Sequence, residues 1–106
     1  MTQPALTASE LHLITGVFSG HPEITEVKLF GSRAKRTHTP RSDVDLAVWG
    51  DMDALAAERV AAELDELPLP YRFEVQPFEL IKLQTLREHI ERVGIPIYRH
   101  PDHARA

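Results

Sequence analysis

Two aspartates separated by one residue, Asp43 and Asp45, are the side chains with the clearest chemical potential in this sequence. Side chains alternate between the faces of a strand, so both carboxylates of DVDLAVW point to one side while Val44 and Leu46 point to the other. Like charges this close need cations between them, and Mg²⁺ takes hard oxygen ligands from carboxylates and substrate phosphates. The pair therefore predicts a magnesium site, although DxD spacing alone is more often a strand cap beside a surface residue.

A glycine and a serine precede the aspartates at a predicted strand-to-helix turn. Gly31 permits close approach of the backbone, the first amides of the following turn are unpaired donors, and the Ser32 hydroxyl adds a hydrogen bond. Such a turn can bind phosphate, although Gly-Ser alone is an ordinary helix start and the Walker motif is absent. Five of the twelve Lys and Arg residues fall in fourteen residues without an acid: Lys28, Arg33, Lys35, Arg36 and Arg41. This local charge could hold a polyphosphate, although a charge run is more commonly a solvated surface.

A third carboxylate is available in the segment YRFEVQ. This segment alternates, so Phe73 and its apolar neighbours face the core while Glu74 faces the other side. In two-metal transfer a carboxylate on a neighbouring strand completes the metal site, although Glu74 alone is equally well an exposed polar residue. A phosphate turn beside paired carboxylates provides the two halves of a site for phosphoryl or nucleotidyl transfer.

The pattern around these motifs predicts alternating helices and strands. Thr7 and Glu10 have the form of a capping box, which starts the first helix. The expected elements are a helix over 8–19, a strand over 26–30, one or two helical turns after Ser32, a loop over 37–42, a strand over 43–49, a helix over 52–67, a strand over 71–76, a helix over 80–93 and, if IPIY forms one, an edge strand over 95–98. This order predicts an α/β or α+β fold, with a mixed sheet covered by helices.

Leucines and caps predict which helix faces meet the core. Asp51 is the expected N-cap of the helix over 52–67, whose core face is expected to comprise Leu55, Val60, Leu64 and Leu67. Leu80 and Leu83 begin the apolar face of the last helix, which Gly94 ends. Trp49 and Tyr71 are expected to pack in the core or at an edge, because no run of aromatics accompanies the basic cluster.

Composition limits the class of protein. The 106 residues, with 42% hydrophobic and 26% charged side chains, predict one globular domain over residues 1–99, with a flexible tail over 100–106. The absence of cysteine excludes disulfides, thiolate nucleophiles and Cys-based zinc sites. No leader or membrane span is recognisable, and the net charge of −4 disfavours nucleic acid as a direct acceptor. We therefore expect a cytoplasmic protein.

The segment GS, followed by ten residues and DVDL, resembles the signature of the DNA polymerase beta-like nucleotidyltransferase superfamily. The chain length is similar to that of its minimal nucleotidyltransferase branch, MNT, and the resemblance covers residues 24–76. It implies a polymerase beta-like fold that uses ATP or another nucleoside triphosphate and two Mg²⁺ ions. The implied nucleotide-binding residues are Gly31, Ser32, Arg33 and Lys35, and the implied catalytic and metal-binding residues are Asp43, Asp45 and Glu74.

The sequence departs from that family pattern at two places. The usual run is GSRARG, whereas Lys35 here stands at the second arginine and Arg36 at the glycine. Lysine keeps the charge without the bidentate geometry, so we expect a less rigid phosphate contact. The third carboxylate is more often Asp, and the longer Glu74 side chain is expected to shift the metal that activates the acceptor hydroxyl.

The resemblance implies one function and leaves two alternatives open. MNT proteins are commonly antitoxins paired with a helical HEPN-domain toxin, which implies Mg²⁺-dependent transfer of AMP from ATP onto a tyrosine of that partner. Alternatively, the chain is an antitoxin that neutralises its partner by binding alone, with an inactive nucleotide site. Transfer to a small molecule such as an aminoglycoside is a weaker alternative, because 106 residues leave little room for acceptor-binding structure.

Overall fold

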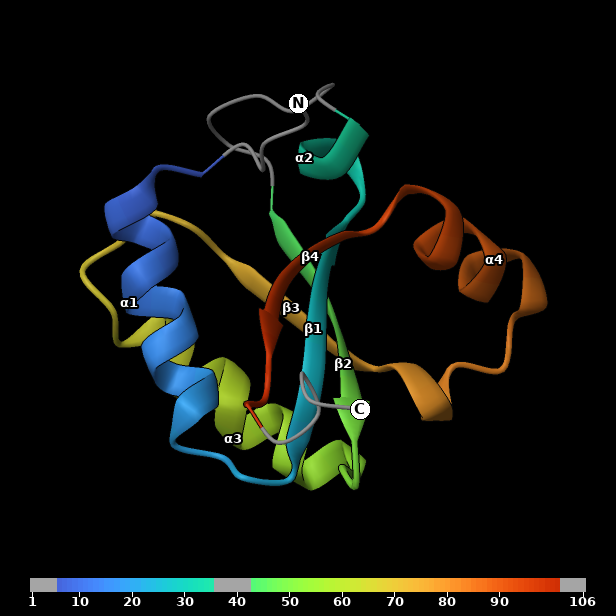
Figure 1. Ribbon diagram of the computed structural model, residues 1–106, viewed down its shortest axis with the longest axis horizontal. Helices are drawn as coiled ribbons and strands as arrows, with labels where there is room; N and C mark the ends of the chain where they lie inside the picture. Colours follow the sequence, from blue (N-terminus) through green and yellow to red (C-terminus); the bar gives the residue numbers. More distant parts are fainter. Residues whose placement is uncertain (1–5, 36–42, 102–106) are drawn as a thin grey trace.

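The computed structural model describes residues 6–35 and 43–101, which form one mixed sheet between two layers of helices (Figure 1). The predicted loop over 37–42, with Arg36 before it, and the end of the predicted tail lie outside the described residues. The elements are α1 (Ala8–Ser19), β1 (Ile24–Phe30), α2 (Ser32–Lys35), β2 (Val44–Gly50), α3 (Ala54–Asp65), β3 (Phe73–Pro77), the 3₁₀ helix η1 (Phe78–Leu80), α4 (Gln84–Val93) and β4 (Ile95–Arg99). The predicted fold class is confirmed, including the edge strand formed by IPIY.

The sheet has the strand order β3-β2-β1-β4. β1 pairs antiparallel with both β2 and β4, whereas β2 and β3 run parallel. Two neighbouring parallel strands must be joined by a crossover connection from the end of one strand to the start of the next, and α3 lies in this connection. As a result, β2 and β3 both begin at the end of the sheet where α2 lies (Figure 1).

Alternation along the strands divides the apolar residues between two cores. α1 and α3 cover one face of the sheet, and α4 lies on the other side (Figure 1). Leu29, Val44 and Leu46 are fully buried in the first core with Phe18 of α1. The second core, under η1 and α4, comprises Phe30, Ala47, Phe78, Ile81 and Ile90. Each fully buried aliphatic side chain contributes about 1.5–3 kcal/mol, so these layers fix the strands that carry the polar residues.

The first helix begins where its capping box predicts. The Thr7 hydroxyl accepts a hydrogen bond from the Glu10 amide at 3.1 Å, and the Glu10 carboxylate accepts one from the Thr7 amide at 2.9 Å. Ile14 and Phe18 are fully buried, as the helical spacing indicates. Local sequence is sufficient here because both cap partners lie within one turn.

The N-cap and core face predicted for α3 are wrong in part. Asp53, not Asp51, is the N-cap, and its carboxylate accepts a hydrogen bond from the Ala56 amide at 2.8 Å. Leu55 lies on the side of α3 opposite Leu64 and is 56% exposed, whereas Val60 and Leu64 are fully buried. The helix ends at Asp65, so Leu67 packs against the core from beyond it.

The start of the last helix and of the third strand also differ from the prediction. α4 begins at Gln84, because the residues after Pro77 first form η1. Leu80 and Leu83 consequently lie outside α4 and are 51% and 64% exposed. β3 begins at Phe73, and Tyr71 packs against the core from the preceding segment.

Two leucines of α3 provide a test of this helix orientation. We expect Leu64→Ala to lower the free energy of unfolding by about 2–5 kcal/mol, because it leaves a cavity in a fully buried site. The control Leu55→Ala removes an exposed side chain and should change it by no more than about 0.5 kcal/mol. Urea denaturation of both variants measures the difference, and equal losses would contradict the orientation.

Candidate active site

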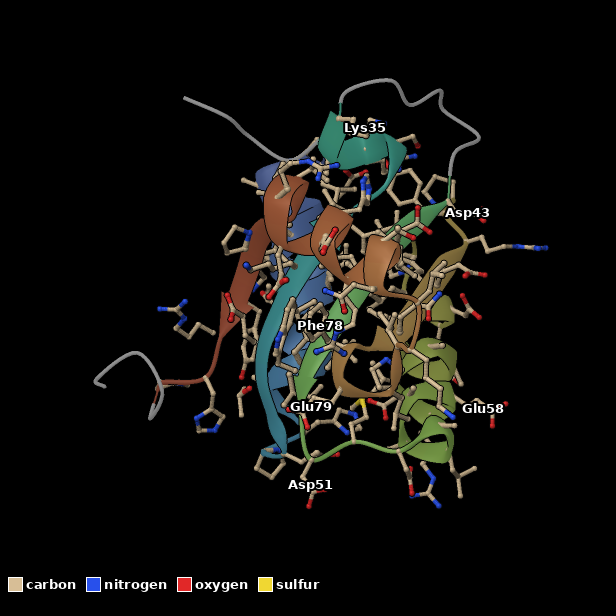
Figure 2. The ribbon with its side chains drawn as sticks, turned by 90° about the vertical axis from the view of Figure 1, so that its right-hand side faces the viewer. Lys35, Asp43, Asp51, Glu58, Phe78 and Glu79 are labelled. Carbon is tan, nitrogen blue, oxygen red and sulfur yellow. The ribbon has the colours of Figure 1, made fainter. Side chains whose placement is uncertain are left out.

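The sheet register brings the predicted carboxylates together at one end. Asp45 of β2 is paired with Glu74 of the parallel strand β3 and with Phe30 of the antiparallel strand β1. Residues that are directly opposite in neighbouring strands share a face, so these three side chains form a row on the side that carries α4. Asp43 immediately precedes β2, and Figure 2 shows it at the same end of the molecule as Lys35 of α2.

The surroundings of Asp45 disfavour the ionised form of its carboxyl group. Partial burial raises the pKa of the Asp45 carboxyl, and the nearby charges of Glu74 and then of Asp43 raise it further. Desolvation and like charge both disfavour the ionised form, so a site built in this way favours a cation that neutralises it. The three acidic side chains are therefore electrostatically coupled, as the predicted metal site requires.

Gly31 brings the phosphate turn into contact with this carboxylate row. Its backbone has a φ of 76°, in the left-handed region that a side chain rarely adopts. A Cβ atom at this position would overlap the Oδ2 atom of Asp45, whose side chain fills the space that glycine leaves. The turn and the carboxylate can approach so closely only because residue 31 has no side chain.

The cations near the turn have separate surroundings. Lys35 at the end of α2 is exposed, and its amide donates to the Gly31 carbonyl at 3.1 Å. Arg33, by contrast, is only 2% exposed, and its Cζ atom lies 4.5 Å from the ring centroid of Tyr71. Lys28 lies over Trp49, with its Nζ atom 5.3 Å from the ring centroid. Arg36 and Arg41 lie outside the described residues. The nucleotide contacts expected of Arg33 and Lys35 stay predictions.

The donor set fits magnesium in its chemistry. Asp43, Asp45 and Glu74 offer carboxylate oxygens, which Mg²⁺ prefers, and Mg²⁺ is usually held by one or two carboxylates together with substrate phosphates. Among residues 6–35 and 43–101, no three acidic, histidine or cysteine side chains are already arranged around a common point. The adjacent phosphate turn would supply the remaining ligands through a bound triphosphate. The metal-binding role of the three carboxylates stays a prediction.

The second core forms a wall beside the carboxylate row. Ala47, two residues after Asp45 in β2, is fully buried by the cluster that includes Ile81 and Ile90. His89 of α4 makes an edge-to-face contact with Phe30, with 6.4 Å between ring centroids. The site is therefore bounded by α4 on one side, which the sequence pattern did not indicate. The helical spacing of apolar residues in α4 predicts an apolar face but not which strand this face covers.

A second group of residues missed by sequence reasoning lies beneath α2. The Tyr71 hydroxyl donates to the Glu10 carboxylate at 2.7 Å, so the capping residue of α1 also contacts the aromatic ring that supports Arg33. These residues come from three distant parts of the chain, and no local spacing connects them. Tyr71 itself packs against the core, as the sequence predicted.

Comparison with known proteins gives one family and several similar structures. The family described as "Polymerase beta, Nucleotidyltransferase" matches residues 13–103, and no curated protein matches significantly. A chain from a toxin-antitoxin complex with AMP-PNP has a TM-score of 0.73 and 20% identity, over 87% of this chain and 75% of that chain. A chain of the MntA-HepT toxin-antitoxin has a TM-score of 0.68 and 18% identity, over 92% and 78%. A chain from the complex of the tri-AMPylated Shewanella oneidensis HEPN toxin with its MNT antitoxin has a TM-score of 0.67 and 17% identity, over 92% and 76%.

These likenesses confirm the predicted polymerase beta-like fold, which the sequence resemblance implied. At identities of 17–20% they establish the arrangement of the chain and not its ligands. None of the helices within the described ranges is long and apolar enough to cross a membrane.

Substitution of Asp45 tests the electrostatic coupling. The raised pKa means that proton uptake by Asp45 stabilises the fold at low pH, and that this contribution is lost as pH rises through that pKa. At neutral pH the ionised carboxylate therefore opposes folding, and we expect Asp45→Asn to have the higher free energy of unfolding in EDTA. The difference should shrink as the pH is lowered, which urea denaturation at a series of pH values measures.

Magnesium should stabilise the wild type more than it stabilises Asp45→Asn. We expect Mg²⁺ to raise the melting temperature of the wild type, because it neutralises the carboxylates, and to raise that of Asp45→Asn much less. Asp51→Asn is the matched control, because Asp51 is exposed and lies at the end of the molecule opposite Asp43 (Figure 2). An equal shift in all three proteins would contradict a metal site at Asp45.

Proposed function

The chain belongs to the polymerase beta nucleotidyltransferase family, and from this membership and the geometry of the site we propose that it transfers a nucleoside monophosphate onto a hydroxyl group. The observation that carries the proposal is the direct approach of Gly31 to Asp45. The turn that we propose to bind phosphate thus lies against a carboxylate that has two acidic neighbours. A nucleoside triphosphate needs both partners, because its phosphates bind amides while its metal ions bind carboxylates.

In the proposed reaction, the backbone amides after Gly31 and the Ser32 hydroxyl bind the phosphates. The exposed Lys35 adds positive charge beside them, and Asp43, Asp45 and Glu74 hold the metal ions. When bound, Mg²⁺ neutralises the triphosphate and lowers the pKa of the acceptor hydroxyl. The acceptor hydroxyl gives its proton to water, its oxygen forms a bond to the α-phosphorus, the bond from that phosphorus to the bridging oxygen breaks, and pyrophosphate leaves in line.

For the donor and acceptor, we propose ATP and a hydroxyl of a HEPN-type toxin. One similar chain occurs in a toxin-antitoxin complex with AMP-PNP, and another occurs in the complex of a tri-AMPylated HEPN toxin with an MNT antitoxin. Both structures are complexes with a partner protein, which favours a protein as the source of the hydroxyl. On this proposal the chain is an antitoxin that modifies its toxin in the cytoplasm.

A binding-only antitoxin is the second candidate. It is favoured by the exposed Glu74 and by the absence, among the described residues, of a ready three-carboxylate arrangement. In that case, the partner is neutralised by contact, and the carboxylates are not needed to neutralise it. The two candidates differ in whether the effect on the partner requires Asp43 and Asp45.

Transfer of labelled nucleotide tests the proposal. We incubate the purified protein with Mg²⁺, ATP labelled at the α-phosphate and a lysate of its source cells. We expect label on one protein band with the wild type and none with Asp43→Asn plus Asp45→Asn, since that variant cannot hold the metal ions. Mass spectrometry of the band identifies the acceptor residue.

The matched control removes the same charge elsewhere. Asp51→Asn plus Glu58→Gln changes two exposed carboxylates that lie far from Asp43 (Figure 2) and should transfer label at the wild-type rate. If none of the four nucleoside triphosphates labels any band while the toxin is still neutralised, transfer is excluded and the binding-only antitoxin stands.

A further inference from the structure

Three side chains beneath α2 form a continuous contact from the phosphate turn to the start of α1. The guanidinium of Arg33 lies over the Tyr71 ring, with Cζ 4.5 Å from the centroid, and is almost completely buried. The Tyr71 hydroxyl in turn donates to the Glu10 carboxylate at 2.7 Å. Tyr71 is therefore held between a cation and an anion, and each contact restrains it in a different direction.

Glu10 is itself fixed in place. Its Oε1 atom accepts a hydrogen bond from the Thr7 amide, and its Oε2 atom accepts the one from Tyr71, so both carboxylate oxygens are used. The hydrogen bond from the Thr7 amide lowers the pKa of Glu10, as do the hydrogen bond from Tyr71 and the charge of Arg33. The carboxylate remains ionised at neutral pH and provides a rigid anchor at the first turn of α1.

α2 needs an anchor of this kind because it is very short. It comprises four residues, and one turn of helix fixes many backbone dihedrals for few hydrogen bonds, so it has little stability of its own. Arg33 and Ala34 are its buried residues, while Lys35 is exposed. The position of Ser32, next to Arg33, therefore depends on what holds the Arg33 side chain.

The same tyrosine lies beside the strand ends that carry the carboxylates. The Arg72 carbonyl, next to Tyr71, accepts a hydrogen bond from the Val44 amide at 2.8 Å, which ties the segment before β3 to the start of β2. The Tyr71 ring also makes an edge-to-face contact with Phe73, with centroids 6.4 Å apart. Tyr71 thus joins the phosphate half of the site to the carboxylate half.

We propose that Tyr71 is a positioning residue that sets the phosphate turn, Gly31 and Ser32, against the carboxylate row by holding Arg33 on its ring and by its hydrogen bond to Glu10. Its effect on nucleotide binding rests on the proposed function, whereas its effect on the turn does not. On this inference, Arg33 acts within the protein through Tyr71, and the exposed Lys35 is the cation of α2 that reaches a phosphate.

Three variants of the full chain separate the contacts. Tyr71→Phe keeps the ring under Arg33 and loses the hydrogen bond to Glu10, and Tyr71→Leu loses both. Tyr98→Leu is the matched control, because half-buried Tyr98 packs its ring on Phe18 at 5.6 Å and belongs to β4. The control removes a comparable aromatic contact without touching α2.

The first measurement is hydrogen exchange of the amides of residues 31–35 without nucleotide, under conditions where each variant is folded. We expect Tyr71→Leu to speed this exchange about tenfold, from the lost cation–π contact and hydrogen bond, with Tyr71→Phe in between. Tyr98→Leu should stay within about twofold of the wild type, because its contact lies outside the cluster. Wild-type exchange in Tyr71→Leu, or equally fast exchange in Tyr98→Leu, would overturn the proposal.

The second measurement is the dissociation constant for AMP-PNP with Mg²⁺. We expect Tyr71→Leu to raise this constant about tenfold, with a partial effect of Tyr71→Phe and none of Tyr98→Leu. A change that only lowered the stability of the fold would affect binding alike in Tyr71→Leu and Tyr98→Leu. An unchanged constant in Tyr71→Leu contradicts the link to binding. If the wild type itself binds no nucleoside triphosphate, the proposed function fails, and the exchange measurement still decides the role of Tyr71 in the turn.

Discussion

The approach of the Gly31 backbone to the Asp45 carboxylate is the constraint on which the candidate site depends. A side chain at residue 31 would occupy the space of the Asp45 carboxylate and would also force a backbone conformation that costs about 1–3 kcal/mol outside glycine. With glycine, the phosphate turn lies directly against the carboxylate row. Neither half would be an effective binding site alone, because acids without a cation repel one another and a helix of a single turn binds anions weakly.

The mixed sheet makes this constraint possible. Because β2 and β3 run parallel, Asp45 and Glu74 occupy the same row, and because β1 is antiparallel to β2, its C-terminal end brings Gly31 to the start of β2. The apolar residues that alternate with these polar ones are buried under α1 and α3. The hydrophobic cores thus fix a register in which like charges remain close, and the pKa of Asp45 is raised by its burial and then by the charges of Glu74 and Asp43.

Sequence alone predicted those features whose determinants are local. Alternation predicted that Asp45 and Glu74 face the same side, which the strand register confirms, and the spacing of Thr7 and Glu10 located the start of α1. It failed for α3 in two ways: Asp51 and Asp53 are both good N-caps, and Leu55 and Leu64, about two and a half turns apart, lie on opposite sides of a helix, so only one of them can face the core. It could not find the contact between Glu10 and Tyr71, which lie 61 residues apart and are joined only in the fold.

The distribution of arginine and lysine in the turn follows from these surroundings. Relative to the run GSRARG, the chain has arginine at the first basic position, Arg33, and lysine at the second, Lys35. Arg33 is buried on an aromatic ring, where a planar and weakly hydrated guanidinium loses less hydration than a compact, strongly hydrated ammonium would. Lys35 is exposed, where a phosphate would meet it chiefly as a point charge, and a strongly hydrated ammonium serves that purpose. Lysine therefore replaces arginine at the position whose surroundings tolerate the change. Arg33 and Lys35, which look equivalent in the sequence, thus have different physical requirements.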